Sequence, residues 1–243
     1  MIVPKKIKNQ IRYFIRLIKD IRKGYIFHFA SPGKRQSKNQ FPFNSQITIQ
    51  QKIFPGHLSE NKVHNMKIAT SRISNVPIYS QEIFSFFNFV GDPTFQKGYK
   101  TGRTLVNGSL DESIGGGLCQ LAGLIFHLAL ESGMEILERH NHSIDIYTEE
   151  TRYTPLGLDA AVSYLQKDLR FRNCYNFPVC LTFEVSEKFL AGTILSPQKI
   201  PKFSFYIESE SFGDIKKVSL YRKLFENPSE TEHLGTSIYR NSL

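Results

Sequence analysis

GGGLCQLAGLIFHLALESG, residues 115–133, is the stretch from which we predict the fold of this chain. Its apolar side chains cover nearly the whole circumference of the helix that they predict, so this helix should be buried. The three glycines before it permit positive φ or the close approach of another strand or a ligand, and Gly133 ends the helix. We therefore expect a buried central helix with Cys119 in its first turn.

Two interpretations of Cys119 follow from this position. At a helix start, the unpaired backbone amides and the positive end of the helix dipole lower the pKa of a thiol and favour the thiolate. Cys119 is therefore a candidate nucleophile. A free cysteine is also one of the residue types found most often in protein cores, where it packs as a small apolar side chain. From the helix alone both interpretations stay open.

A thiolate nucleophile needs a base within hydrogen-bond reach, and the base needs an orienting partner. His127 lies eight residues further along the same helix, at about 1.5 Å of rise per residue, and is therefore too far from the thiol. The stretch HNHSIDIY at 140–147 predicts an extended strand, in which His140 and His142 share the apolar face. Both histidines are candidate bases.

Three interpretations of this histidine pair compete. The pair belongs to a Cys/His catalytic site in which Asp145 or Asp159 orients the base, or it is hydrogen-bonded within the core, or it ligates a metal through its HxH spacing. No third ligand has a convincing spacing for a metal, so we expect neither a metal site nor a cofactor.

The remainder of the chain predicts strands. Alternating apolar and polar residues indicate them at 169–172, 179–185, 189–195, 202–208 and 216–225. Residues 59–74 predict a second helix, and Asn107-Gly108 predicts a two-residue hairpin turn. We therefore predict an α+β domain over residues 59–243, in which the buried central helix packs on a largely antiparallel β-sheet.

The basic charge of the chain belongs to an N-terminal appendage. Residues 1–45 hold eleven Lys and Arg against one acid, Asp20, which gives +10, whereas the whole chain carries +9. Within residues 1–30, a basic amphipathic helix is predicted over 5–23, with a helical stripe at Ile7, Ile11, Phe14, Ile15, Ile18 and Ile21. The composition of residues 31–58 predicts a linker that passes into irregular chain or a short strand.

Two roles for the amphipathic helix stay open. Its stripe lies on an anionic membrane surface, or it docks on the main domain or a partner protein. Nucleic acid is not an expected partner, because one basic helix without a reading motif is weak support. The chain has no apolar run of roughly 18 residues, which a membrane span would need. Basic residues near the N-terminus also interrupt the apolar segment that a signal peptide requires. We therefore expect a cytoplasmic protein, at most peripheral at the inner membrane face.

The three cysteines, Cys119, Cys174 and Cys180, are too few for a disulfide-stapled secreted scaffold.

Several segments together resemble the VanW domain family. The matching segments are GGGLCQ (115–120), ERHNHS (138–143), PLGLDAAV (155–162) and DLRFRN (168–173), with NKVHNMKIA (61–69) and EIFSF (82–86) resembling its N-terminal half. They agree in order and spacing over roughly residues 59–196. The chain looks like the short, vancomycin-resistance accessory type without an export signal.

The VanW family is associated with bacterial cell walls, and some extracytoplasmic members are L,D-transpeptidases that join peptidoglycan stem peptides through a cysteine thioester. The resemblance implies Cys119 as the nucleophile, His142 as the leading base ahead of His140, and Asp159 as the orienter. We also expect substrate-binding or oxyanion roles for residues of the same motifs, which are Gly115, Gly116, Gly117, Leu118, Gln120, Arg139 and Ser143.

Two functions follow from these expectations. The first is a thiol acyltransferase, similar to an L,D-transpeptidase, that acts on peptidoglycan stem peptides or their precursors. The second is a non-catalytic accessory protein of cell-wall metabolism or glycopeptide resistance, held at the inner membrane face by residues 5–23. Rapid labelling of Cys119 at neutral pH would favour the enzyme, whereas inertness until denaturation would favour the packed cysteine.

Overall fold

The computed structural model describes residues 4–34, 43–106, 109–145, 152–224 and 227–241. It confirms the α+β class, since helices combine with sheets whose described strand pairs are antiparallel except for one, β7 with β13. Among the described residues, no helix combines the length and the apolar composition that a membrane span requires.

The main sheet has the strand order β1-β10-β9-β2. Its strands are β1 (Ser45–Lys52), β10 (Phe189–Ser196), β9 (Val179–Val185) and β2 (Pro77–Ile78). Strand β1 pairs with β10 over its whole length. The segment 31–58, which we expected to pass from a linker into irregular chain or a short strand, therefore contributes a full strand of the main sheet.

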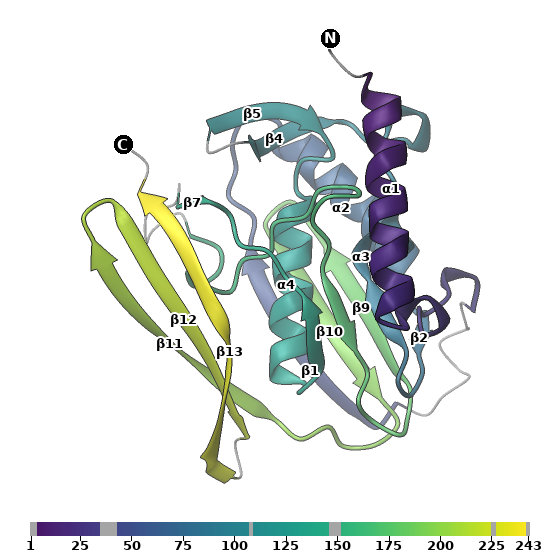
Figure 1. Ribbon diagram of the computed structural model, residues 1–243, viewed down its shortest axis with the longest axis vertical. Helices are drawn as coiled ribbons and strands as arrows, with labels where there is room; N and C mark the ends of the chain where they lie inside the picture. The colour runs from purple at the N-terminus through teal and green to yellow at the C-terminus, as the bar shows by residue number, and fades with distance from the viewer. Residues whose placement is uncertain (1–3, 35–42, 107–108, 146–151, 225–226, 242–243) are drawn as a thin grey trace.

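Two helices pack side by side on this sheet (Figure 1). Helix α4 (Leu118–Glu131) lies on β1 and β10, and helix α2 (Ser59–Ile73) lies on β9. Gly192 of β10 explains how closely α4 approaches, because a Cβ atom there would lie 2.9 Å from side-chain carbons of both Leu124 and Leu128. At this one position the sheet has no side chain, so Leu124 and Leu128 of α4 pack directly on its backbone.

Smaller elements complete the main domain. A second sheet has the order β3-β8-β6, with β3 (Ile83–Ser85), β8 (Arg170–Arg172) and β6 (Glu135–Glu138). Strands β4 (Thr101–Val106) and β5 (Ser109–Ile114) form a hairpin up to the pair Val106↔Ser109, and the predicted turn at 107–108 lies outside the described residues. Short helices lie at α3 (Phe86–Val90), η1 (Tyr25–Phe27), η2 (Pro32–Lys34) and η3 (Phe95–Lys97).

A third sheet stands beside the main domain (Figure 1). It contains β11 (Phe203–Phe212), β12 (Ile215–Leu224), β13 (Asn227–Asn241) and β7 (Ile144–Asp145). The regular strand that we predicted through 140–147 does not form, since β6 ends at Glu138 and β7 starts at Ile144; residues 146 and 147 lie outside the described chain.

Helix α1 (Lys5–Arg22) confirms the predicted N-terminal helix, and it lies against the outside of the main domain (Figure 1).

Candidate active site

Glycines fix the chain at the start of α4. Gly115 and Gly117 have φ of +91° and +99°, a backbone conformation that residues with a Cβ atom rarely adopt. Gly116 packs on the backbone of β4, because a Cβ atom on it would lie only 2.6 Å from Cα and C of Gly102. The close approach is therefore to another strand, which was one of the two reasons that the sequence suggested for the glycines.

Asn65 of α2 holds this turn in place. Its side-chain Nδ2 donates to the carbonyls of Lys100 (2.9 Å) and Gly116 (3.0 Å), and its Oδ1 accepts from the Lys100 amide (2.8 Å). The side chain is fully buried, and its hydrogen bonds join α2, the residue directly before β4 and the glycine turn. Sequence reasoning missed this residue, although it lies within the NKVHNMKIA motif.

Cys119 is half-buried in the first turn of α4. Its Sγ lies 3.5 Å from the amide nitrogen and 3.7 Å from the carbonyl oxygen of Val162, so the segment that follows Asp159 covers the helix start. An amide that donates to sulfur favours the thiolate over the thiol.

His142 and Asp159 join the thiol. Oδ2 of Asp159 accepts from the His142 backbone amide at 2.8 Å and pairs with the imidazole Nδ1 at 2.7 Å. The imidazole also interacts electrostatically with the side chain of Cys119, and each group shifts the pKa of the other. The structure thus brings these three side chains together in the order thiol, imidazole, carboxylate.

The protonation of the three groups follows from these contacts. Burial alone would raise the pKa of the Cys119 thiol, but the hydrogen bond and the positive charge of His142 outweigh it and hold the pKa below 9.0. Burial would likewise lower the pKa of His142, but hydrogen bonds to Asp159 and Cys119 raise it to about 10. Burial opposes ionisation of Asp159 too, yet His142 and Arg139 lower its pKa to about 2. The contacts therefore favour the thiolate of Cys119 more than that of a free cysteine, with the imidazole of His142 as its charged partner.

Arg139 and Tyr239 support Asp159 from the other side. Tyr239 donates to Oδ1 of Asp159 at 2.5 Å, and Nη2 of Arg139 donates to the same oxygen at 2.8 Å. Arg139 also donates to the carbonyls of Gly157 (2.9 Å) and Asp159 (2.7 Å) and to the Ser237 hydroxyl. These internal bonds hold Arg139 against Asp159 and β13, and the substrate-binding role that we expected for Arg139 stays a prediction.

Sequence reasoning missed Tyr239, which lies on β13. Burial and the Asp159 carboxylate raise the pKa of its phenol, so it remains a hydrogen-bond donor. No motif marked it, because it lies outside the segments that carried the resemblance.

Other expected site residues lie elsewhere. His140 pairs with Glu138 at 3.0 Å, and Gln120 is buried and donates to the Lys52 carbonyl at 2.9 Å. The side chain of Ser143 is exposed, and its carbonyl accepts from the Arg240 amide. These contacts give none of the three a place beside the thiol.

Two further residues named from the sequence are engaged away from the thiol. Asp145 binds Arg152, and His127 lies 3.3 Å from Glu131 within α4.

The backbone amides at the start of α4 divide into two groups. The Leu118 amide donates to the Gly115 carbonyl at 3.3 Å, so it is engaged within the turn. In the described part of the chain, no acceptor is found for the amides of Cys119 and Gln120. The amides of Gly116 and Gly117 likewise have no acceptor among the described residues, so they and the amides of Cys119 and Gln120 are the candidates for stabilising an oxyanion.

The other cysteines differ from Cys119. Cys180 is buried, and burial raises the pKa of its thiol to about 12, while Cys174 is exposed on the surface. Within the described ranges, no group of three or more His, Cys, Asp and Glu side chains is placed to hold a metal ion.

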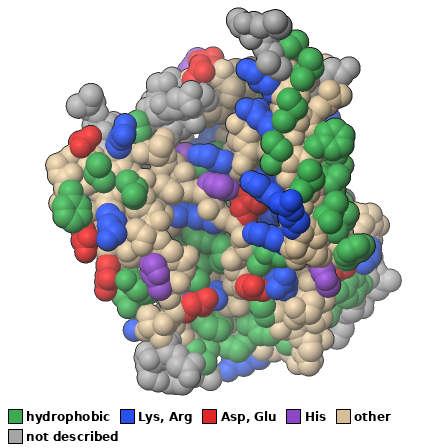
Figure 2. Space-filling model, viewed as in Figure 1, with side chains coloured by type: hydrophobic (Ala, Val, Ile, Leu, Met, Phe, Trp, Pro, Cys, Tyr) green, Lys and Arg blue, Asp and Glu red, His purple; other side chains and the backbone are tan. Residues whose placement is uncertain are grey.

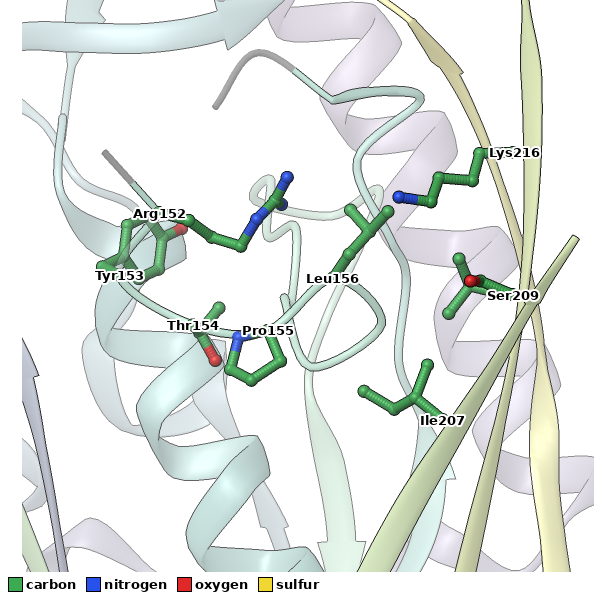
Figure 3. Close-up of a pocket in the computed structure, with 9 residues that line it drawn as sticks. Arg152, Tyr153, Thr154, Pro155, Leu156, Ile207, Ser209 and Lys216 are labelled. Atoms are coloured by element: carbon green, nitrogen blue, oxygen red, sulfur yellow. The ribbon is translucent and has the colours of Figure 1, made fainter. Parts of the chain in front are cut away.

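A cavity of about 430 Å³ lies between residues 152–156 and the β11–β12 hairpin (Figure 3). It is lined by Arg152, Tyr153, Thr154, Pro155, Leu156, Ile207, Ser209, Lys216 and Val218. Figure 3 shows Arg152 and Lys216 reaching into it from opposite sides. Arg152 is bound to Asp145 at 2.7 Å, whereas Lys216 forms no ion pair with any described residue. The cavity therefore carries positive charge.

Lys62 connects this cavity to the start of α4. Its Nζ lies 5.9 Å from the centroid of the Tyr153 ring, and its side chain packs where a Cβ on Gly117 would lie. Burial, with a smaller contribution from Arg103, lowers the pKa of Lys62 to about 8.

Comparisons with known proteins match the region that contains the site. A family model described as VanW like protein matches residues 61–195. The uncharacterized protein YoaR of Bacillus subtilis (strain 168) is 36% identical over 123 residues, which are 51% of this chain and 39% of that protein. The vancomycin B-type resistance protein VanW of Enterococcus faecalis (strain ATCC 700802 / V583) is 35% identical over 158 residues, or 65% of this chain and 57% of that protein.

The matched region thus spans less than two thirds of either relative. No solved structure matches this chain. Cys119, His142 and Asp159 lie inside the matched family region, whereas α1 and Tyr239 lie outside it.

Proposed function

Because this chain belongs to the VanW family, we propose that it is a cysteine-dependent acyltransferase of the L,D-transpeptidase type, acting on peptidoglycan stem peptides or their precursors. One observation carries the proposal: Asp159 binds the imidazole of His142 at 2.7 Å, and this imidazole interacts with the half-buried Cys119 thiol in the first turn of α4. Activation of a thiol by a paired base is how cysteine nucleophiles work.

In the first half of the reaction, the Cys119 thiolate attacks the carbonyl carbon of the amide bond to be broken and forms a C–S bond. The amides of Cys119 and Gln120 would stabilise the oxyanion of the tetrahedral intermediate. His142 donates its proton to the leaving nitrogen, the C–N bond breaks, and an amine departs. A thioester on Cys119 and a neutral imidazole remain.

In the second half, an amine of another peptide attacks the thioester carbonyl. His142 takes the proton of this amine, the C–S bond breaks, and the new amide leaves. The thiolate and the imidazolium are restored. Asp159 remains ionised throughout, since its pKa of about 2 lies far below that of the imidazole.

The choice of substrate rests on the family resemblance and on charge. Stem peptides carry carboxylates, and the cavity beside residues 152–156 offers the ammonium group of Lys216 together with apolar walls. A carboxylate-bearing peptide is complementary to such a surface. One relative is named for resistance to vancomycin, and this name is consistent with a role in the bacterial cell wall.

The test is to incubate the protein with a disaccharide-tetrapeptide fragment of peptidoglycan and to record its intact mass. We expect an acyl adduct, mapped by peptide sequencing to Cys119, and cross-linked dimers of the fragment in the solution. Cys119→Ala should abolish both, whereas Cys174→Ala, which removes an exposed thiol away from the site, should keep both. Lys216→Met should raise KM without lowering kcat if the cavity binds the substrate carboxylate.

Two outcomes would count against the enzyme. An adduct on Cys174 or Cys180 would contradict the assignment of the nucleophile. A Cys119 thiol that reacts with no acyl donor and no alkylating reagent until the protein is denatured would favour a non-catalytic accessory protein.

A further inference from the structure

The outer face of α1 is apolar and exposed. Its side chains Ile7, Ile11, Phe14, Ile15, Ile18 and Ile21 are each between 46% and 60% exposed. Two residues after the helix extend this face, Ile26 at 39% and Phe27 at 86%. Figure 2 shows these hydrophobic side chains along the outer edge of the molecule, at the right of the view. An exposed apolar patch of this extent usually marks an interaction site.

The opposite, polar face of α1 is the one that docks on the main domain. Arg16 pairs with Glu138 at 2.6 Å and lies 3.3 Å from Asp168. Asp20 binds Arg170 through two hydrogen bonds of 2.6 and 3.1 Å, and both side chains are buried. A helix on a globular domain normally turns its apolar stripe inward, so this orientation leaves the stripe without an intramolecular partner among the described residues.

Cations border the apolar face. Lys8, Lys19 and Arg22 are exposed, and the helical spacing places them directly beside the stripe. Asp20 is the one acid in α1, and it is engaged with Arg170. The surface is therefore apolar along its middle and positive along its rim.

We propose that this outer face of α1, with Ile26 and Phe27, binds the surface of a lipid bilayer that contains acidic phospholipids. Interfacial helices combine an apolar face with Lys and Arg beside it, and they lie in the plane of the headgroups. Acidic headgroups would neutralise the rim while the stripe enters the acyl boundary. A second copy of the chain fits less well, because a symmetric contact through this face would set its cations against each other.

The first test is co-sedimentation of the whole protein with vesicles. We expect binding to vesicles of phosphatidylcholine with phosphatidylglycerol, and weaker binding to phosphatidylcholine alone or at high salt. Phe14→Glu should weaken binding by roughly ten-fold or more. Phe212→Glu is the matched control, because Phe212 is also exposed, at 63%, but lies on β11.

Charge is tested separately. Lys19→Gln should weaken binding to the acidic vesicles, whereas Lys188→Gln removes an exposed charge from another surface and should not. Binding that is unchanged in both Phe14→Glu and Lys19→Gln would overturn the proposal.

A spectroscopic reporter gives an independent reading. The chain contains no Trp, so Phe14→Trp introduces a single indole on the proposed surface. Its emission should shift to shorter wavelength when acidic vesicles are added, while that of Phe212→Trp should not. Equal behaviour of the two indoles, or a Phe14-dependent dimer in solution with no vesicle binding, would overturn the proposal.

Discussion

A single carboxylate decides how His142 is held. Oδ2 of Asp159 engages both the backbone amide and the ring nitrogen of His142, so the side chain replaces the partner strand that a regular β-strand would need. His140, two residues earlier, is turned to Glu138 instead. The expected common face of the two histidines is therefore wrong, and only His142 is placed beside the thiol.

At the residue scale, we predict that alkylation of Cys119 depends on His142. In a Cys174→Ser background, iodoacetamide should react with Cys119 at a pH below the usual thiol pKa, because the imidazolium persists until its own pKa of about 10. His142→Ala leaves only the Val162 amide to oppose the effect of burial, so the pKa of Cys119 should rise and the rate near neutral pH should fall by roughly ten-fold or more. The measurement is the alkylation rate from about pH 5 to about pH 9.

The denatured protein is the control for this profile, since its thiols should titrate at about 8.5. A pH profile that His142→Ala does not move would show that the imidazole has no effect on the thiol.

At the element scale, the start of α4 depends on a backbone contact with β4. The β4–β5 hairpin brings Gly102 against Gly116, and Asn65 fastens the turn to α2. The first-turn amides near Cys119 are therefore aimed by three elements at once. Such a turn resists small displacements because its neighbours are backbone atoms rather than flexible side chains.

We predict that Gly116→Ala destabilises the protein and disturbs the site. The new Cβ would lie 2.6 Å from the Gly102 backbone, so β4 or α4 must shift, at a cost of about 1–3 kcal/mol. Urea unfolding measures this loss. Gly56→Ala is the matched control, because a Cβ there meets no atom within 4 Å. Equal stability of the two variants would contradict the close contact.

At the scale of the whole molecule, ion pairs attach α1 to the main domain. Glu138 of β6 binds Arg16 and His140, and these hydrogen bonds outweigh the effect of burial and lower its pKa to about 2. Its neighbour Arg139 faces the other way and joins Asp159 to β13. Two adjacent residues thus connect the N-terminal helix and the third sheet to the same edge of the main domain.

We predict that Asp20→Asn loosens α1. The substitution removes a buried partner of Arg170. Breaking such a pair lowers the free energy of unfolding by about 3–5 kcal/mol. We expect the lower end of this range, because Arg170 keeps its ion pair with Asp168. Hydrogen exchange should rise along α1 more than elsewhere. Glu210→Gln, which breaks the exposed pair with Lys217, should cost less than about 1 kcal/mol and leave exchange in α1 unchanged. Uniform exchange changes would contradict a role in docking.

Local patterns predicted much of this fold. The helices expected at 59–74 and 115–133 are α2 and α4, and most of the expected strands are present. Within 31–58 the sequence left irregular chain and a short strand as alternatives, because the polar composition did not show that β1 pairs along its whole length with the distant β10. It also left open which face of α1 would dock, since periodicity shows that a helix has two faces and not which one meets the domain.

The site was predictable only in part for the same reason. Cys119, His142 and Asp159 lie in recognisable motifs, and the structure brings them together. Tyr239 carried no local signal, and the alternation around Arg170 gave no indication that this side chain is buried between Asp20 and Asp168. Long-range polar contacts of this kind leave no periodic trace in a sequence.

The bond from Tyr239 to Asp159 also has a consequence for the order of synthesis. The two residues are 80 positions apart, and Arg139 and Tyr239 are 100 apart. A ribosome that adds about 5–20 residues per second therefore synthesises Cys119 several seconds before it synthesises β13. We expect the nascent chain to carry an ordinary thiol during that interval. Reactivity would arise only once translation has reached β13 and that strand has folded against the rest.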